Sequence, residues 1–173
     1  AAEGFEVILV TGDKDMLQVV GDRVTVLAPQ ARGEDHLRMD PAAVAGRWGG
    51  GPEHIRDVLA LMGDSSDNIP GVPGVGEKTA VELMRRFGSL EELYRQLAEV
   101  KKPALKQKLE VHRDLAFLSR ELATVRADLD LGIELDALPV APIRRDELLA
   151  FARRWEIRRL ETVAGDHGVP AAD

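Results

Sequence analysis

Four aspartates in two short segments of the sequence could together hold a metal ion. Asp13 and Asp15 follow an apolar run, and Asp64 and Asp67 lie much further along the chain. Residues two apart in an extended chain, or three apart in a helical turn, project to one side. Carboxylate oxygens without any sulfur ligand suit Mg²⁺ or Mn²⁺. Taken singly, Asp64 or Asp67 could instead cap a short helix, and Asp13 could end a strand.

A segment rich in glycine and valine, residues 69–80, could grip phosphate groups. Glycine lets the backbone turn sharply and removes the Cβ atoms that would keep a phosphate away from main-chain N–H groups. The helix that we expect to start near Glu77 adds its positive end, and a lysine adds a full charge. A tight turn between two helices is the alternative reading. The residues that we expect to contact DNA are Gly71, Val72, Gly74, Val75, Gly76, Lys78 and Thr79.

The elements at the start of the chain predict a βαβ-like unit that positions the first aspartate pair. Residues 6–10 form a near-continuous apolar run, which is typical of a parallel strand covered on both faces. Residues 24–27 predict a second strand, and residues 14–20 predict a helix between the two. Residues 11–15 would then lie at the carboxyl end of the first strand, where open α/β sheets place their ligand sites.

From residue 40 onward the pattern is mainly helical. Asp40 and Pro41 predict a helix start, and apolar residues recur at helical spacing in 53–62 and 77–87. Gly88 predicts a helix end, and Ser89 with Glu92 predicts a capping box that opens the next helix. The further expectations are a helical stretch over 103–122, an added strand over 123–129 and an amphipathic helix over 144–160.

The fold class that follows is α/β, the end of a parallel sheet followed by a mainly helical region. We expect one domain over residues 1–162, with a sheet portion over 1–39 and a helical portion over 40–162. Residues 163–173 would be a tail or linker.

The composition limits the possible classes of function. The chain has 173 residues, no cysteine and a net charge of -7. Without cysteine, a disulfide framework and a thiolate metal site are excluded. No apolar run is long enough to cross a bilayer, so we expect a cytoplasmic protein without a membrane partner. The net charge alone argues against nucleic acid, but a basic stretch over 101–113 weakens that objection, although such runs are more often solvated helix faces.

The histidines and tryptophans give weaker signals. The four histidines are scattered without metal-ligand spacing. We expect Trp48 and Trp155 to fill the core, since aromatic residues make up only 4% of the chain and do not support a base-stacking platform.

Two motifs together carry a family resemblance. Thr11-Gly12-Asp13-Lys14-Asp15 after an apolar strand, followed by one continuous block over 63–80, resembles the 5′ nuclease family. This family comprises the 5′-to-3′ exonuclease domain of bacterial DNA polymerase I and the related flap endonucleases. The resemblance extends over nearly the whole chain and is most specific in the block GDSSDNIPGVPGVGEKTA.

The resemblance implies a metal-dependent phosphodiesterase that acts on 5′ ends and flaps during DNA replication and repair. Asp13, Asp15, Asp64 and Asp67 fall on family positions that hold part of the metal site, and Mg²⁺ or Mn²⁺ would serve as cofactor. The block around residues 71–79 falls on the family's helix-hairpin-helix, which the resemblance implies over residues 64–88. This motif follows the duplex, often with K⁺ held by hairpin carbonyls. The implied partner is duplex DNA with a 5′ flap or 5′ end.

The resemblance also implies that this sequence is a piece of a longer protein. The first part of the sheet, the remaining metal-binding carboxylates and the arch of the family would lie in an N-terminal nuclease segment outside this sequence, and a polymerase domain could follow its end. Whether this chain is an enzyme alone is therefore open. A catalytically inactive fragment that binds duplex DNA through its helix-hairpin-helix is the alternative, and a purely structural helical domain is a third.

Overall fold

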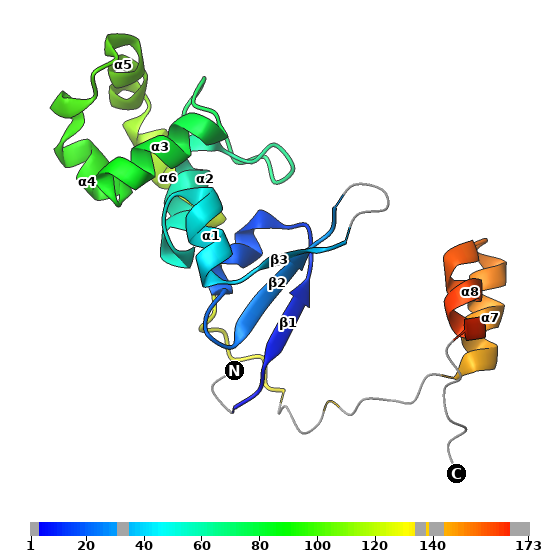
Figure 1. Ribbon diagram of the computed structural model, residues 1–173. Helices are drawn as coiled ribbons and strands as arrows, with labels where there is room; N and C mark the ends of the chain where they lie inside the picture. The colour runs from blue at the N-terminus through cyan, green and yellow to red at the C-terminus, as the bar shows by residue number, and fades with distance from the viewer. Residues whose placement is uncertain (1–3, 31–34, 134–137, 139–143, 167–173) are drawn as a thin grey trace. The chain divides into compact units, whose positions relative to one another are not determined.

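The computed structural model describes residues 4–30, 35–133, 138 and 144–166. The chain divides into two compact units, Ala1–Ala127 and Asp128–Asp173 (Figure 1). None of the helices in the described part is long and apolar enough to span a membrane. The predicted segment 163–173 lies largely outside the described residues, and the predicted division of the chain at residue 162 stays a prediction.

The first unit begins with a three-stranded sheet in the order β1-β2-β3 (Figure 1). Strand β1 (Val7–Val10) pairs in parallel with β2 (Val24–Ala28), and β2 pairs antiparallel with β3 (Leu37–Met39). The parallel pair confirms the predicted α/β start. The third strand was not predicted, because three residues are too few to show an alternating pattern.

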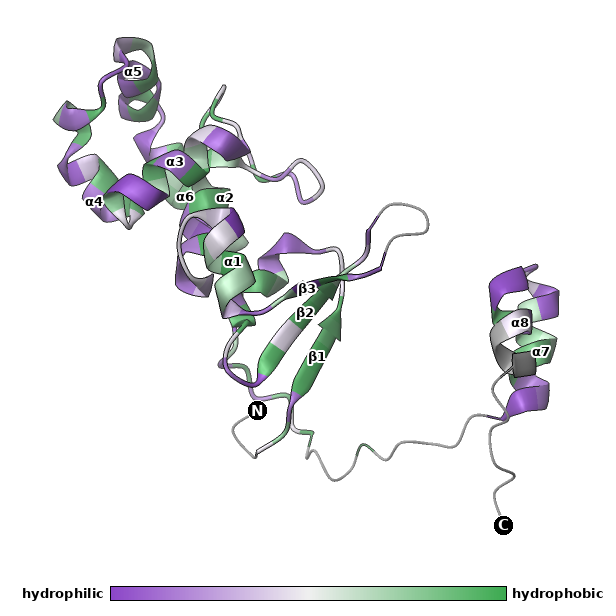
Figure 2. Ribbon diagram, viewed as in Figure 1, coloured by the Kyte–Doolittle hydropathy of each residue, from purple (hydrophilic) through white to green (hydrophobic). Residues whose placement is uncertain are grey.

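Strand β1 differs from the prediction in its burial. Residues 6–10 were expected to be covered on both faces, but the side chains alternate, with Ile8 57% and Val10 65% exposed. Figure 2 shows the strand as hydrophobic along its length. The prediction was wrong because an apolar run reports only which residues are apolar, and a cover on each face must come from other elements.

The segment between β1 and β2 is a 3₁₀ helix, η1 (Lys14–Val19), rather than the expected α-helix. Asp13 caps it, because its carboxylate accepts a hydrogen bond of 2.9 Å from the N–H of Asp15. Val20, which ends the element, returns to extended backbone. The tighter turn is typical of short connectors, and it places two aspartates at the start of the element.

Two short helices then lead to the centre of the unit. Helix α1 (Pro41–Trp48) begins as predicted, with the Asp40 carboxylate accepting from the N–H of Ala43 at 2.9 Å. The predicted helix over 53–62 is a 3₁₀ turn, η2 (Pro52–His54), followed by helix α2 (Ile55–Met62). Gly63 ends α2.

The remaining helices of the first unit follow the predicted pattern closely. Helix α3 (Glu77–Phe87) ends at Gly88, which has a positive φ of 81°. The Ser89 hydroxyl then accepts from the N–H of Glu92 at the start of α4 (Leu90–Arg95). A 3₁₀ turn η3 (Leu97–Glu99) precedes α5 (Pro103–Val111) and α6 (Arg113–Ala123). The mainly helical region is therefore confirmed, with the stretch over 103–122 divided into two helices.

The core of this unit is built around α2, which packs against α3 and α6. Ile55, Val58 and Leu59 are fully buried, and Trp48 fills the core as expected, with 1% of its surface exposed. The buried Asp57 accepts from the N–H of Leu90 at 3.1 Å, so its carboxylate satisfies a donor at the start of α4. Helix α2 is therefore buried on nearly all sides, and the elements around it pack against it.

Three predictions about the last third of the chain were wrong. Residues 123–129 contain no strand: α6 reaches Ala123, and the backbone from 124 to 129 is irregular. The helix expected over 144–160 is a pair, α7 (Arg145–Arg154) and α8 (Arg158–Asp166), which pack together. The break falls where Glu156 has a positive φ of 54°. Trp155 is 61% exposed instead of filling the core.

Candidate metal centre and hairpin

Three of the four predicted aspartates meet at one place. Carboxylate oxygens of Asp13, Asp15 and Asp67 lie within 4.8 Å of one another. Asp13 and Asp15 come from the start of η1, and Asp67 comes from the residues that connect α2 to α3. We call these three residues the carboxylate cluster. Carboxylates gathered at this spacing repel one another unless a cation or protons lie among them.

Asp15 shows the electrostatic cost of this arrangement. Burial raises the pKa of its carboxyl to about 6, and the charges of Asp13, Asp67 and Asp64 add to the rise. One of its oxygens, Oδ1, is buried without a hydrogen-bond partner. A buried carboxylate oxygen without a donor lacks the stabilisation that such groups normally have. The donor set, three carboxylates of which one has an oxygen without a donor, fits a divalent cation such as Mg²⁺ or Mn²⁺.

Asp64, the fourth predicted aspartate, has a different environment. Its carboxylate is buried and forms an ion pair with the ammonium group of Lys14. The other oxygen accepts from the N–H of Ser66 at 2.8 Å. The hydrogen bond from Lys14 is the largest cause that lowers the pKa of Asp64. Asp64 thus ties the start of η1 to the residues after α2, and it also fixes a local turn. Residues 65–68 form a turn and not a helix, so Asp64 is not a helix cap.

The residues that connect α2 to α3, residues 63–76, form a hairpin whose glycines are required by close backbone contact. We call these residues the connecting segment. A Cβ atom on Gly71 would lie 2.7 Å from the Cα of Gly63, and one on Gly63 would lie 2.6 Å from the carbonyl oxygen of Ile69. Both glycines have positive φ. Asp64 and Ile69 also exchange backbone hydrogen bonds of 2.8 and 2.9 Å. Glycine at these two positions therefore serves the folding of the hairpin.

Several N–H groups of the connecting segment are already used inside the protein. Gly71 donates to the hydroxyl of Ser119 at 3.1 Å, Val72 donates to the carbonyl of Leu61 at 2.8 Å, and Val75 donates to that of Val72 at 2.9 Å. The side chains of Val72 and Val75 are buried and so anchor the segment in the core. These three residues hold the hairpin in place, so a phosphate would have to find donors elsewhere.

Donors for a phosphate are found where the connecting segment enters α3. Gly76 is the N-cap, and no side chain caps this helix, so the first N–H groups of α3 have no intrahelical acceptor. The space beside Gly76 is open, and Lys78 is exposed beside it. Gly74 lies against the ammonium group of Lys108, which comes from α5. Gly74, Gly76, Lys78 and Thr79 thus form the outward part of the predicted set.

Sequence reasoning missed three residues that shape this region. Lys14 lies between two aspartates in the sequence, but it pairs with Asp64, and spacing along the chain does not predict this distant partner. Ser119 and Lys108 approach the connecting segment only through the packing of α6 and α5. No local pattern in the sequence predicts either contact.

Comparison with family models identifies residues 51–146 as the family "5′-3′ exonuclease, C-terminal SAM fold". Among curated relatives, DNA polymerase I of Bacillus caldotenax is 43% identical over 98% of this chain. The thermostable DNA polymerase I of Thermus aquaticus is 43% identical over 91% of it. The chain spans about a fifth of the length of these relatives, 20% and 18% respectively.

Solved structures with a similar fold are nucleases. A zinc-bound 5′-exonuclease of bacteriophage T5 aligns over 92% of this chain and 53% of its own, with a TM-score of 0.58 and 21% identity. The catalytic core of Rad2 in complex with DNA substrate aligns over 90% of this chain and 56% of its own, with a TM-score of 0.56 and 16% identity. At these identities the likeness shows the fold alone. The family model matches more than half of this chain, and the relatives named above are 43% identical to it. The chain therefore belongs to the 5′-3′ exonuclease family.

Proposed function

We propose that this chain supplies metal-binding carboxylates and a duplex-binding hairpin to a 5′-to-3′ exonuclease and flap endonuclease. The substrate would be DNA with a 5′ end or a 5′ flap, and the reaction would be hydrolysis of a phosphodiester bond. One observation carries the proposal: the connecting segment contains both Asp67 of the carboxylate cluster and the glycines that lead into the uncapped start of α3. A duplex held by one part of this segment would lie next to the metal held by the other.

Asp13, Asp15 and Asp67 would hold Mg²⁺ or Mn²⁺ through their carboxylate oxygens. When bound, such an ion polarises the phosphate and lowers the pKa of a bound water. The raised pKa of Asp15 supports this role, because burial and then the neighbouring carboxylates raise it, and a bound cation would stabilise the charged form against both. We also assign Asp64 to the metal site, at its rim. Its partner is Lys14, so direct coordination of the metal by Asp64 would require this ion pair to separate.

DNA would be held at the start of α3. The free N–H groups of the first turn, the open space at Gly76 and the charge of Lys78 together suit a backbone phosphate. The shape of the hairpin would be fixed by hydrogen bonds inside the protein, which are donated by Gly71, Val72 and Val75. K⁺ bound by hairpin carbonyls remains a prediction from the resemblance.

A second candidate function is duplex binding without cleavage by this chain alone. Two-metal hydrolysis places its ions about 3.5–4 Å apart and needs ligands for both. In the described residues, the carboxylate cluster is the one group of three or more potential ligands that meets at a single point. Further ligands would come from an N-terminal nuclease segment, and a polymerase domain would follow the chain. A cytoplasmic location, where bacterial DNA lies, belongs to this proposal.

A flap-cleavage assay with a parallel binding assay tests the proposal. The chain would be incubated with a labelled 5′-flap duplex in Mg²⁺ or Mn²⁺, and duplex binding would be measured by fluorescence anisotropy in EDTA. We expect binding in EDTA that Gly76→Val reduces at least ten-fold. Cleavage abolished by Asp67→Asn supports the enzyme, and binding without cleavage supports the second function. Absence of duplex binding would contradict both.

A matched control exists for the hairpin variant. Gly46 lies exposed in α1 with open space around it, as Gly76 does at the start of α3. Gly46→Val should therefore leave duplex affinity unchanged. Equal losses in Gly46→Val and Gly76→Val would remove the hairpin from the interface.

A further inference from the structure

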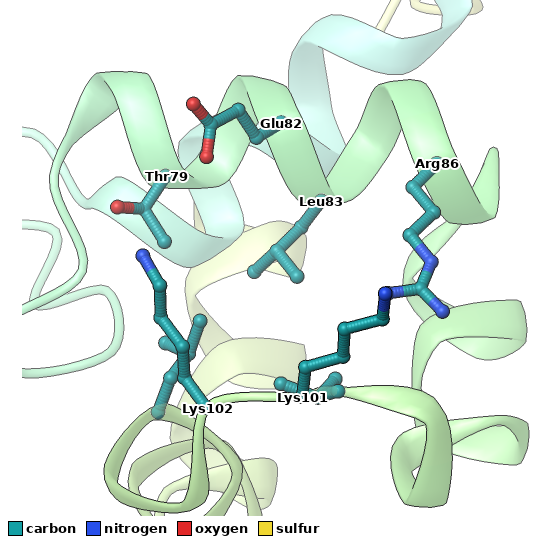
Figure 3. A pocket seen from close by; sticks show the side chains of 8 residues that line it. Thr79, Glu82, Leu83, Arg86, Lys101 and Lys102 are labelled. Atoms are coloured by element: carbon teal, nitrogen blue, oxygen red, sulfur yellow. The ribbon is translucent and has the colours of Figure 1, made fainter.

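A groove with basic walls lies between α3 and the residues that lead into α5. Its α3 side is formed by Thr79, Glu82, Leu83 and Arg86, and its other side by Val100, Lys101, Lys102 and Leu105. Figure 3 shows the two sides facing each other across an open space. We call this the basic groove. None of its lining residues except Thr79 belongs to the hairpin set described above.

The charges in the basic groove are not balanced within the protein. Arg86 pairs with Glu99 at 3.1 Å, but Lys101 and Lys102 have no ion-pair partner among the described residues. In Figure 3 Lys101 extends toward Arg86, and Lys102 extends toward Thr79. Two cations that point toward one another repel unless an anion lies between them. Glu82 is the one acid on the lining, so the groove keeps an excess of positive charge.

Apolar residues at the bottom of the groove support the side chains of the two lysines. Leu83 and Val100 are each 7% exposed, and Leu105 packs against the same core. The methylene stems of lysine lie favourably on such apolar surface while the ammonium groups stay in water. The two ammonium groups are therefore presented to the groove, which is unusual in a chain whose net charge is -7.

The basic groove continues from the hairpin. Thr79 lies in the first turn of α3 and also lines the groove, and Arg86 lies two turns further along the same helix. At a rise of about 1.5 Å per residue, this part of α3 extends about 10 Å. One strand of duplex DNA advances about 3.4 Å per nucleotide, so the same length corresponds to about three nucleotides.

We propose that the basic groove binds consecutive backbone phosphates of duplex DNA, continuing along α3 the contact that begins at the hairpin. This inference rests on the proposed function. Lys101 and Lys102 neutralise phosphates and read no base, because their ammonium groups act as point charges. Glu82 repels the same phosphates and limits affinity. The groove sets how far from the hairpin the duplex is held.

The test is the salt dependence of duplex affinity, measured by anisotropy in EDTA on two duplexes of different sequence. Lys101→Gln with Lys102→Gln should weaken binding equally for both sequences. The slope of log affinity against log salt should become shallower by about 1 for each lysine. Glu82→Gln should strengthen binding. The matched control is Lys106→Gln, which removes one lysine of α5 that does not line the groove. The slope for this variant should stay within about 0.3 of the wild-type slope, which is about one third of the change expected for one lost phosphate contact.

Three outcomes are distinguishable. If wild type binds and Gly76→Val abolishes binding, but the groove variants keep the wild-type slope, the groove proposal is wrong and the hairpin stands. If Lys102→Gln and Lys106→Gln change the slope equally, only net charge matters and the groove is again contradicted. If wild type binds no duplex, both the groove and the proposed function are wrong. Circular dichroism of each variant verifies that the helices are intact.

Discussion

The backbone N–H of Gly71 donates a hydrogen bond of 3.1 Å to the hydroxyl of Ser119, a residue of α6 that is fully buried. This contact joins the sharpest point of the connecting segment to a helix 48 residues further along the chain. The hairpin is therefore fixed from inside the protein, and its shape depends on α6 as well as on its own glycines.

Ser119→Ala should destabilise the fold by about 1–3 kcal/mol, because the buried N–H of Gly71 then loses its acceptor. Urea denaturation followed by circular dichroism measures this difference. Ser65→Ala, at an exposed position of the connecting segment, should change stability by no more than about 0.5 kcal/mol. Equal stability of the two variants would mean that water or another group replaces the hydroxyl.

Gly71→Ala should be far more damaging than Gly76→Ala. At Gly71 the new methyl would lie 2.7 Å from the Cα of Gly63, and φ is +61°. Backbone cannot move aside as a flexible side chain does, so we expect a loss of more than about 3 kcal/mol or failure to fold. At Gly76 nothing lies within 4 Å of the added atom, and thermal melting should change little. A tolerated Gly71→Ala would contradict the close contact of the two chain segments.

Asp15→Asn should stabilise the chain in EDTA at pH 7. Burial raises the pKa of Asp15 from its usual value of 3.8 to about 6, so between these pH values the folded state holds a proton that the unfolded state releases. Stability of the wild type should therefore fall as the pH rises from about 4 to 6. The variant lacks this dependence, and its advantage should grow over the same range. Denaturation curves at several pH values test this, and an unchanged advantage would mean that Asp15 titrates normally.

Lys14→Met should destabilise the chain at pH 7, because it leaves the buried carboxylate of Asp64 without its cation. We expect a loss of about 1–3 kcal/mol, below that of a fully buried pair, since the Lys14 side chain is 35% exposed. The pair lowers the pKa of Asp64, so its contribution is present above about pH 4 and is lost as the pH falls through the lowered value. Asp22→Asn, at an exposed position, is the control. A loss that persists in acid would point to packing of the lysine stem.

Local signals in the sequence predicted the elements that local chemistry determines. Asp40, Gly88 and Ser89 marked helix ends correctly, because caps depend on residues a few positions apart. The apolar spacing of α3 identified its buried face. Helix α2 is instead buried on nearly all sides, because other elements pack around it. The predictions that failed depended on distant partners. Val10 is apolar yet exposed, and Trp155 is large yet lies on the surface.

The candidate site, like the fold, was predicted where local residue types determine it and not where distant residues meet. The residue types showed that Asp13, Asp15 and Asp67 suit a metal, but only the fold shows that they meet. The same reasoning placed Asp64 with them, whereas in the structure it pairs with Lys14. The glycines at 71 and 74 were read as openings for phosphate. The structure adds a further reason for Gly71, since its backbone passes directly beside Gly63.

The most direct test of the metal centre is isothermal titration of Mn²⁺ into the wild-type chain and three variants at pH 7. Asp15→Asn and Asp67→Asn each remove one carboxylate of the cluster, and Asp22→Asn removes an exposed carboxylate elsewhere. We expect the wild type and Asp22→Asn to bind with the same affinity, and the two cluster variants to bind about ten-fold or more weakly. Equal affinity in all four proteins would contradict a metal site at Asp13, Asp15 and Asp67.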